Sequence, residues 1–262
     1  FQQDLGDINL YTWLKRKQGG DTFDQETKQI YNKVLDSLLL FQSKGIKDLD
    51  LGLCYPHRSF DRQSMMWDMN YFKYMLLKLL AIPFNEQLLE HDFISLADYL
   101  LLPGQDYFLY RDFQTANIMI VDGEPWFIDY KGGRKGASQY DLASLLYDAK
   151  VQMQPVDREL FLKYYIENFC SVTGEEKDKF REYYNGFCMI RLMQALGAFG
   201  FRGLYEHKPT FTDSIVPGVR LLIEIINKTE DHLKLPELFR TIRSIPESRA
   251  YRDLKEGLIK GD

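Results

Sequence analysis

The sequence predicts an α+β fold that is mostly helical, with a small β-hairpin sheet in its middle. Long stretches on both sides of the middle place apolar residues at helical spacing. Between them lie three short apolar runs, and the last two are separated by V-D-G-E, whose Asp-Gly pair is a strong hairpin signal. The 262 residues, 45% of them hydrophobic, are enough to bury a substantial core. We therefore expect many helices around one small sheet.

The first part of the chain predicts a strand end, a helix and a connection. Residues 1–10 indicate the end of a strand followed by a turn at Gly6. The stretch 24–43 has helical spacing and runs into Gly45, a typical helix stop. Residues 46–62 are polar and contain a Y-P-H turn, so we expect an irregular connection there.

The later elements follow from the same patterns. The run MMWDMNYFKYMLLKLL at 65–80 is apolar nearly all round, which predicts a buried helix. The next helix, at 86–102, ends at a Pro-Gly pair. After it we expect strands at 107–110, 118–121 and 126–129, and helices at 139–150, 156–170, 174–205, 213–228 and 234–243.

Charge and cysteine usage exclude several classes of function. A net charge of −5 and a pI near 5.5 disfavour a nucleic-acid binder that neutralises phosphates. No apolar stretch approaches the roughly 20 residues that span a bilayer, so no membrane partner is expected. The three cysteines lack metal-site spacing and are odd in number, which favours a reducing cytoplasm.

Three polar residues gather around the expected hairpin, in the segment YRDFQTANIMIVDGEPWFIDY. With the turn centred near Gly123, Asn117 and Asp129 each lie six residues from it and would meet at the open end. Carboxylate and carboxamide oxygens are ligands suited to Mg²⁺. Asp112, five residues before Asn117, would project over the same spot. The alternative is an acidic turn that only caps the hairpin.

These motifs resemble a known family of enzymes. R-D-F-Q-T-A-N is similar to the kinase catalytic loop H-R-D-x-x-x-x-N, and I-D-Y stands in the place of D-F-G. The short gap between the two, together with Y-D-L-A-S-L-L-Y-D at 140–148, resembles the aminoglycoside phosphotransferase and choline kinase-like family. Within it, D-L-G-D at 4–7 adds a likeness to bacterial kinases that phosphorylate N-acetylmuramate and N-acetylglucosamine at the anomeric hydroxyl. The fold implied is a protein-kinase-like C-terminal lobe.

The resemblance implies a role for each residue of the motif. Asp112 would be the catalytic base, and Asn117 and Asp129 would bind Mg²⁺ against the phosphates of ATP. Asp141 would accept hydrogen bonds from the backbone of the catalytic loop, residues 110–117, and hold its shape; an ordinary helix cap at Asp141 is compatible with that role. The metal motif would be residues 128–130.

The beginning of the chain would be the hinge of such a kinase. Residues 1–10 would form this hinge and the end of a small lobe, with residues 11–262 forming the helical large lobe. The backbone of Gln3, Asp4 and Leu5 would face the adenine. The small lobe, with its phosphate-covering loop, has no counterpart in the sequence, so a preceding lobe of the same gene product is expected. Without it we predict weak nucleotide binding and little turnover.

Two residues depart from the family pattern at the start of the catalytic loop. Tyr110 stands where protein kinases have His, which alters the usual brace of the loop. Arg111 replaces the Gly that is common in antibiotic kinases. Its side chain would reach a substrate anion or the transferred phosphoryl group, as a catalytic residue, or would form a structural salt bridge.

Three further residues are candidates for contacting the substrate. Asp68 lies in an apolar run, and because an unpaired buried carboxylate is costly it faces the substrate cleft or pairs with a base. Gln114, on the catalytic loop, is a candidate partner for a sugar hydroxyl. In G-G-R-K-G at 132–136, a shortened activation segment, Arg134 would meet an anionic group together with Lys131 and Lys135. The alternative for that stretch is a solvated turn.

The resulting prediction is an ATP-dependent phosphotransferase that acts on a hydroxyl of a sugar or amino sugar in cell-wall sugar recycling. Its partners would be ATP, Mg²⁺ and a small-molecule acceptor. One alternative keeps the chemistry and changes the acceptor to choline, homoserine or an aminoglycoside. Another is a non-catalytic nucleotide-binding or scaffold module. A protein kinase is disfavoured because the chain lacks an A-P-E segment.

Overall fold

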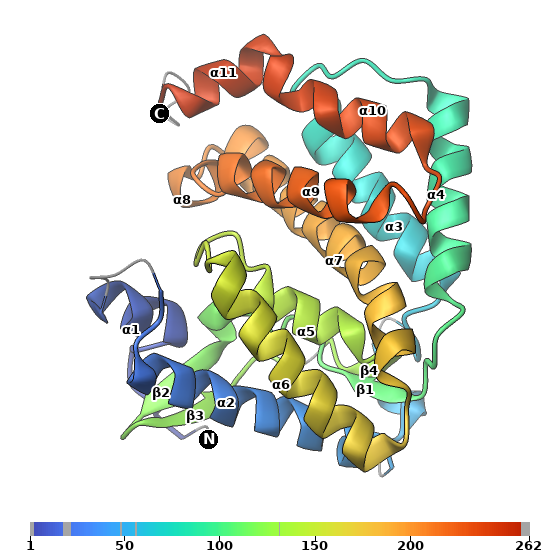
Figure 1. Cartoon of the computed structure of the whole chain (residues 1–262). Helices are drawn as coiled ribbons and strands as arrows, with labels where there is room; N and C mark the ends of the chain where they lie inside the picture. Colours follow the sequence, from blue (N-terminus) through green and yellow to red (C-terminus); the bar gives the residue numbers. More distant parts are fainter. Residues whose placement is uncertain (1–2, 18–21, 48, 56, 131, 258–262) are drawn as a thin grey trace. The chain divides into compact units, whose positions relative to one another are not determined.

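The computed structural model describes residues 3–17, 22–47, 49–55, 57–130 and 132–257. The fold is α+β and mostly helical, as predicted (Figure 1). The chain divides into two compact units, each built from two separate segments. The first comprises Phe1–Phe60 and Pro103–Tyr184, and the second comprises Asp61–Leu102 and Asn185–Asp262.

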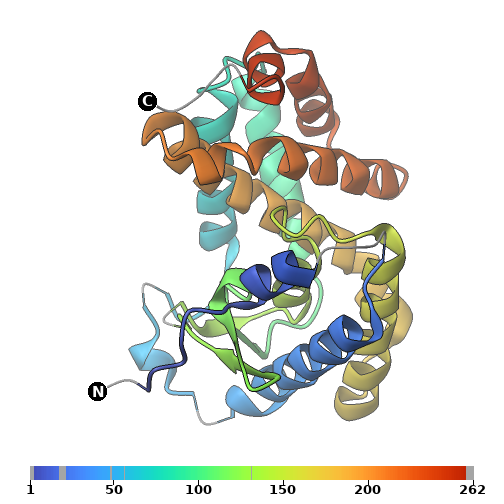
Figure 2. The same ribbon diagram turned by 90° about the vertical axis from the view of Figure 1, so that its left-hand side faces the viewer.

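The first unit carries the two small sheets and the helices beside them. Its helices and strands are α1 (Leu10–Lys17), α2 (Gln25–Leu40), β1 (Tyr107–Leu109), β2 (Ile118–Val121), β3 (Glu124–Phe127), β4 (Arg134–Gly136), α5 (Gln139–Leu146), α6 (Pro155–Thr173) and the first part of α7 (Lys177–Phe199). Helix α2 packs against α6 and β3, and both views show it beside the β2–β3 hairpin (Figures 1 and 2). The hairpin therefore rests on a helical layer.

The structure of helix α2 explains the helical pattern of the sequence at 24–43. Asp24 is its N-cap, and the Asp24 carboxylate accepts a hydrogen bond of 2.7 Å from the backbone N–H of Thr27. The helix continues as a π-helical turn, Phe41–Gly45, so the predicted stop at Gly45 is confirmed. On its buried face Tyr31 stacks on Phe161 of α6, with ring centroids 4.8 Å apart.

The strands form two separate antiparallel sheets of two strands, which corrects the prediction of one sheet. Strand β1 pairs with β4, in which Leu109 lies opposite Arg134. Two charged residues and one glycine make up β4, and for that reason its sequence gave no strand signal. The alternative of a solvated turn at 132–136 is also wrong, since the Arg134 side chain in this strand is buried.

The β2–β3 hairpin closes with a two-residue turn. Asp122 and Gly123 both have positive φ, 52° and 76°, as a type I′ turn requires. Val121 pairs with Glu124, so Asn117 lies opposite Ile128, whose N–H donates to the Asn117 carbonyl at 3.1 Å. The expected pairing of Asn117 with Asp129 is therefore wrong by one residue, because the turn is centred between two residues instead of on one.

The start of the chain forms no strand in the described residues before α1. Asn9 makes an isolated antiparallel bridge to Met119, and the Ile8 carbonyl accepts the N–H of Ile120 at 2.9 Å. Helix α1, which the sequence did not predict, follows directly and packs on the end of the catalytic loop at Thr115–Asn117.

The second unit contains helices joined by turns and loops, and no strand occurs among its described residues. It contains α3 (Arg62–Phe72), α4 (Glu86–Leu100), the rest of α7, α8 (Pro209–Thr212), α9 (Ile215–Thr229), α10 (Pro236–Ser244) and α11 (Arg249–Lys255). A π-helical turn, Lys73–Leu77, extends α3 along the predicted range. That segment is not buried all round, because Trp67, Tyr74 and Leu79 are exposed. Helix α11 was not predicted.

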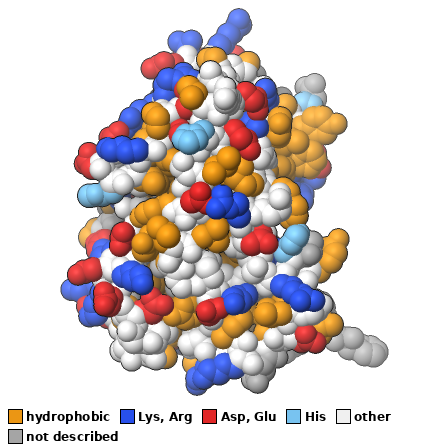
Figure 3. All heavy atoms as spheres, turned by 90° about the vertical axis from the view of Figure 1, so that its right-hand side faces the viewer, with side chains coloured by type: hydrophobic (Ala, Val, Ile, Leu, Met, Phe, Trp, Pro, Cys, Tyr) orange, Lys and Arg blue, Asp and Glu red, His pale blue; other side chains and the backbone are white. Residues whose placement is uncertain are grey.

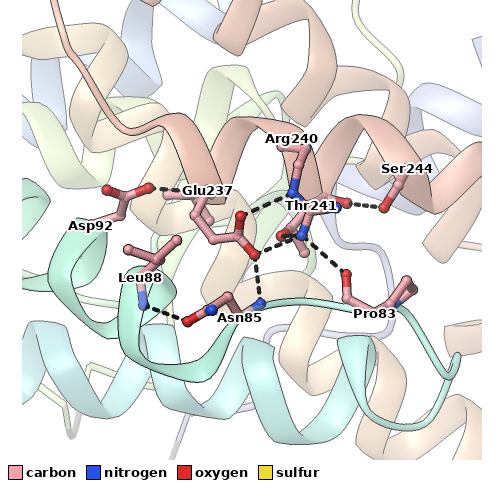
Figure 4. A network of polar contacts seen from close by, with 9 residues as sticks. Pro83, Asn85, Leu88, Asp92, Glu237, Arg240, Thr241 and Ser244 are labelled. Carbon is pink, nitrogen blue, oxygen red and sulfur yellow. Dashed lines mark hydrogen bonds and ion pairs between the residues drawn. The ribbon is translucent and has the colours of Figure 1, made fainter.

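A polar network joins α4 to α10 within this unit (Figure 4). The Glu237 carboxylate accepts the backbone N–H of Asn85 at 2.6 Å and two hydrogen bonds from Arg240, of 2.9 and 2.6 Å. The Asp92 carboxylate accepts the backbone N–H of Leu238 at 2.8 Å, in the first turn of α10. These carboxylates fix where α10 begins.

The distribution of charge on the surface and the character of the helices can be described together. On the face drawn in Figure 3, basic and acidic side chains lie interspersed over the described residues. Among the helices that are described, none combines the length and the apolar character needed to cross a bilayer.

Candidate functional site

The predicted catalytic loop, residues 110–117, folds around the backbone carbonyl of Asp112. That carbonyl accepts the N–H of Gln114 at 2.9 Å and the side-chain amide of Asn117, also at 2.9 Å. The N–H of Asn117 donates to the Gln114 carbonyl at 2.9 Å. The loop thus ties its first carboxylate residue to its Asn through short local contacts.

Asp141 anchors the beginning of this loop. Its two carboxylate oxygens accept the backbone N–H groups of Tyr110, at 2.6 Å, and Arg111, at 2.9 Å. Asp141 lies in the first turn of α5 and is fully buried. These are the contacts that the sequence led us to expect of Asp141, and its part in catalysis stays a prediction.

The environment of Asp141 favours its protonated form. Burial raises the pKa of the Asp141 carboxyl to about 7, and the negative charge of Asp112 adds to this effect. Hydrogen bonds from the backbone of Tyr110 and Arg111 and from the side chain of Gln42 act in the opposite direction. Desolvation is the larger influence because this carboxyl is fully buried.

Tyr110 connects the predicted catalytic loop to the predicted metal motif. Its hydroxyl donates a hydrogen bond of 2.7 Å to the carbonyl of Ile128, the residue before Asp129. Burial raises the pKa of Tyr110 well above its usual value, and the charges of Asp141, Asp129 and Asp112 contribute. The sequence identified the exchange of His for Tyr here but gave no sign that the hydroxyl reaches across to the other strand end.

The carboxylate of Asp112 is available for chemistry. Within the described part of the chain, it has no hydrogen-bond or ion-pair partner, although the residues on both sides of it are held by backbone contacts. A general base needs this combination of a free acceptor and a fixed position.

Asn117 and Asp129 have the donor atoms for a divalent metal. The Asn117 side-chain nitrogen is used by the Asp112 carbonyl, which leaves its amide oxygen for a ligand. Asp129 follows Ile128, the cross-strand partner of Asn117, and adopts a left-handed φ of 65°. No group of three or more His, Cys, Asp or Glu side chains suited to a metal occurs among the described residues. An amide oxygen and a carboxylate nevertheless fit Mg²⁺, which keeps water and phosphate oxygens as its other ligands.

Arg111 packs against aromatic rings. Its guanidinium carbon lies 4.7 Å from the centroid of Phe60 and 5.5 Å from that of Tyr140. Its backbone has a φ of 83°, a conformation that costs about 1–3 kcal/mol for such a residue. The hydrogen bond from its N–H to Asp141 helps to maintain this conformation. The structure adds a packing role to the two alternatives drawn from the sequence.

The predicted hinge residues lie before the bridge to β2. Gln3 and Asp4 are exposed and Leu5 is partly buried. The Asp4 carboxylate accepts the N–H of Gly6 at 2.8 Å, and Gly6 has a φ of 71°. Contact of this segment with a nucleotide stays a prediction.

The remaining candidates differ in how available their side chains are. Gln114 is partly exposed beside Asp112. Arg134 is buried and donates to the carbonyls of Gly132, at 2.9 Å, and Tyr55, at 3.4 Å. Asp68 is buried on α3 in the second unit, whereas the other two belong to the first. All three roles in substrate binding stay predictions.

The two lysines that were expected beside Arg134 have different outcomes. Lys131 lies outside the described residues. Lys135 is half-buried in β4 and pairs with Asp106. An anionic substrate group would have to compete with that carboxylate for Lys135.

Comparison with known proteins finds similarity to small-molecule kinases. No family model matches the chain. The N-acetylmuramate/N-acetylglucosamine kinase of Neisseria meningitidis serogroup B is 26% identical over 207 residues, which cover 77% of this chain and 58% of that protein. The solved structure of an ethanolamine kinase from Plasmodium vivax has a TM-score of 0.56 and 14% identity, covering 83% of this chain and 62% of that one.

A further solved structure, amicoumacin kinase in complex with AMP-PNP, Ca²⁺ and Ami, has a TM-score of 0.49 and 14% identity, covering 80% of this chain and 64% of that one. The chain thus spans less than two thirds of the length of each of these proteins. The sequence match and the fold of the ethanolamine kinase confirm the resemblance to the aminoglycoside phosphotransferase and choline kinase-like family.

Proposed function

We propose that this chain is the catalytic large lobe of a cytoplasmic kinase that transfers the γ-phosphoryl group of ATP to a hydroxyl of a sugar or amino sugar, in the recycling of cell-wall sugars. The observation that carries the proposal is the carboxylate of Asp112, which has no partner among the described residues and lies within a loop fixed by Asp141 and Asn117. The likeness to the meningococcal N-acetylmuramate/N-acetylglucosamine kinase supports the choice of acceptor.

Asp112 is the base in this proposal. Its carboxylate accepts the proton of the acceptor hydroxyl as that oxygen forms a bond to the γ-phosphorus. The bond between the γ-phosphorus and the bridging β–γ oxygen breaks, and ADP leaves with the electron pair. Asp112 can orient the hydroxyl because its own backbone carbonyl is fixed by Gln114 and Asn117.

The other residues hold the reactants. Asn117 and Asp129 would bind Mg²⁺, which neutralises charge on the phosphates when bound. The backbone of residues 3–5 would contact the adenine. Gln114 would contact the acceptor.

The activity is tested by ADP release from Mg-ATP, using the complete gene product that contains this chain. The acceptors would be N-acetylmuramate, N-acetylglucosamine, choline, ethanolamine, homoserine and an aminoglycoside. We expect turnover with one of the two sugars. Turnover with choline, ethanolamine, homoserine or the aminoglycoside would keep the chemistry and replace the acceptor class. Binding of Mg-ATP without turnover on any acceptor would favour a non-catalytic nucleotide-binding module.

The role of the base is tested by replacing Asp112. We expect Asp112→Asn and Asp112→Ala to lower kcat by about 10²–10⁴, with little change in ATP affinity. Asp36→Asn is a matched control, because Asp36 is an exposed carboxylate on α2 of the same unit and bonds only the Tyr164 hydroxyl among the contacts described. Unchanged kcat in the Asp112 variants would show that another group takes the proton.

A further inference from the structure

A second carboxylate contacts the far end of the catalytic loop. The Asp148 carboxylate accepts the hydroxyl of Thr115 at 2.6 Å and the Thr115 backbone N–H at 3.3 Å through the same oxygen. Its other oxygen accepts the N–H of Lys150 at 3.0 Å. Thr115 is fully buried, whereas Asp148 is partly exposed. The sequence motif around Asp141 includes Asp148 but suggested no role for it.

Asp141 and Asp148 hold opposite ends of one loop. Asp141 lies in the first turn of α5 and bonds the N–H groups of Tyr110 and Arg111. Asp148 lies just beyond the last turn of the same helix and bonds Thr115. Asp112 lies between these two points of attachment. One short helix thereby fixes the backbone on both sides of the proposed base.

The middle of the loop is anchored as well. Phe113 is fully buried and stacks on Phe127 of β3, with ring centroids 5.5 Å apart and an angle of 15° between the rings. Residues Thr115–Asn117 form a 3-10 turn that leads directly into β2. Because Phe113 is fixed, a change in the contact at Thr115 would move the Asn117 end of the loop relative to Asp112.

We propose that Asp148, acting through Thr115, is a positioning residue that sets the distance between the base Asp112 and the metal ligand Asn117. The inference rests on the phosphotransfer proposed above. Asp148 touches neither reactant in this scheme; its effect is transmitted by the turn that contains Thr115 and by the hydrogen bond from Asn117 to the Asp112 carbonyl. A displacement of about 1 Å at such a site lowers the rate roughly 10²-fold.

The test removes the contact from each side. Thr115→Val keeps the shape of the side chain and removes the hydroxyl, whereas Thr115→Ser keeps the hydroxyl. Asp148→Asn replaces one acceptor oxygen by a donor nitrogen, which then opposes the N–H of either Thr115 or Lys150. Tyr164→Phe is the matched control, since it removes another hydroxyl that donates to a carboxylate, Asp36, at 2.9 Å.

We expect Thr115→Val and Asp148→Asn each to lower kcat about 10- to 100-fold, with KM for Mg-ATP changed far less. The double variant should lose little more than either single variant, because both break the same contact. Thr115→Ser and Tyr164→Phe should stay within about threefold of the unsubstituted protein. Full kcat in Thr115→Val and Asp148→Asn, with the proteins folded, would overturn the proposal.

Hydrogen exchange separates this inference from the proposed function. Amide exchange measured by mass spectrometry on peptides covering residues 110–120 needs no substrate. We expect faster exchange in these peptides for Thr115→Val and Asp148→Asn. For Tyr164→Phe we expect the exchange rate of the unsubstituted protein. Unchanged exchange would show that Asp148 does not hold the loop. Failure of the unsubstituted protein to turn over any acceptor would overturn the phosphotransfer itself, and the exchange rates would then still decide whether Asp148 fixes the loop.

Discussion

Asp141 in the first unit and Asp92 in the second make the same kind of contact. Each is a buried carboxylate on a helix that accepts backbone N–H groups from a segment distant in sequence: Asp141 from Tyr110 and Arg111, Asp92 from Leu238. Burial raises the pKa of both carboxyls. Both must therefore offset a desolvation cost with their hydrogen bonds.

The two contacts differ in what they hold. Leu238 is in the first turn of α10, so Asp92 satisfies an N–H that every helix start leaves without a partner. Tyr110 and Arg111 lie in an irregular loop, and Arg111 has a left-handed backbone. A helix would keep its shape with a weaker cap, whereas the loop has no repeating pattern to restore it. We therefore expect the same contact to contribute mainly stability in the second unit and mainly loop geometry in the first.

The largest expected effect comes from removing each carboxylate. Asp141→Ala leaves two backbone N–H groups without their acceptor and frees the loop beside Asp112. We expect kcat to fall at least about 10²-fold. Asp92→Ala should destabilise the second unit by about 1–3 kcal/mol and leave kcat unchanged at temperatures where the protein stays folded. Steady-state kinetics and denaturant unfolding of both variants provide the measurement.

The comparison fails if the two variants behave alike. An equal loss of kcat would mean that Asp92 also supports the site. Equal retention of kcat would mean that the loop keeps its shape without Asp141. Hydrogen exchange of peptides from 107–120 and from 236–244 would locate the loosened backbone in each case.

Most helices were predictable because their signals are local. The N-cap Asp24, the apolar spacing behind it and Gly45 all lie within one stretch of sequence. The β2–β3 hairpin was also predictable from its Asp-Gly turn. Strand β4 was missed because its charged residues form a strand only through pairing with β1, more than twenty residues earlier in the chain. Long-range pairing has no local signature.

The candidate site also contains residues with local sequence signals and contacts without them. Asp112, Asn117 and Asp129 stand at fixed spacings on a loop and a hairpin, so a motif made them candidates, although the predicted register of the hairpin was one residue off. The hydroxyl contact of Tyr110 and the contact of Asp148 with Thr115 depend on where separate elements pack. Such contacts need the tertiary structure.

The pH dependence of stability tests the burial of these carboxyls. The pKa of Asp141 is about 7 in the folded chain and 3.8 for an ordinary Asp. The folded state therefore binds this proton more tightly, and the contribution of Asp141 to stability falls as the pH rises from about 4 to about 7. Denaturant unfolding at pH 5, 6 and 7 should show that Asp141→Asn loses part of this slope, at most about 1.4 kcal/mol per pH unit.

Asp92 offers the parallel case in the second unit. Its pKa is also raised by burial, so Asp92→Asn should change the slope in the same direction. Parallel pH profiles of the unsubstituted protein and both variants would contradict the assignment of these protons to Asp141 and Asp92.

A smaller loss of stability is expected when a carboxylate loses one of its hydrogen-bond partners and keeps another. Glu237 accepts the N–H of Asn85 and pairs with the half-exposed Arg240. The hydrogen bonds from the Arg240 guanidinium hold the pKa of the Glu237 carboxyl below its usual value. Arg240→Ala should destabilise the second unit by about 1 kcal/mol without an effect on kcat. Denaturant unfolding measures this change in the free energy of unfolding. A loss of stability greater than that of Asp92→Ala would show that the ion pair contributes more to this network than the contact at the start of the helix.

The smallest effects belong to exposed ion pairs, one in each unit. Lys33 pairs with Glu124 of the hairpin, and Lys228 pairs with Glu224 along α9. Because water and salt screen such charges, Lys33→Ala and Lys228→Ala should each cost only a few tenths of a kcal/mol, a difference that disappears near 1 M salt. Unfolding at low and high salt measures this. A loss of kcat in Lys33→Ala alone would show that the hairpin transmits even a surface contact to Asn117 and Asp129, and would extend the positioning role from the loop to the whole hairpin.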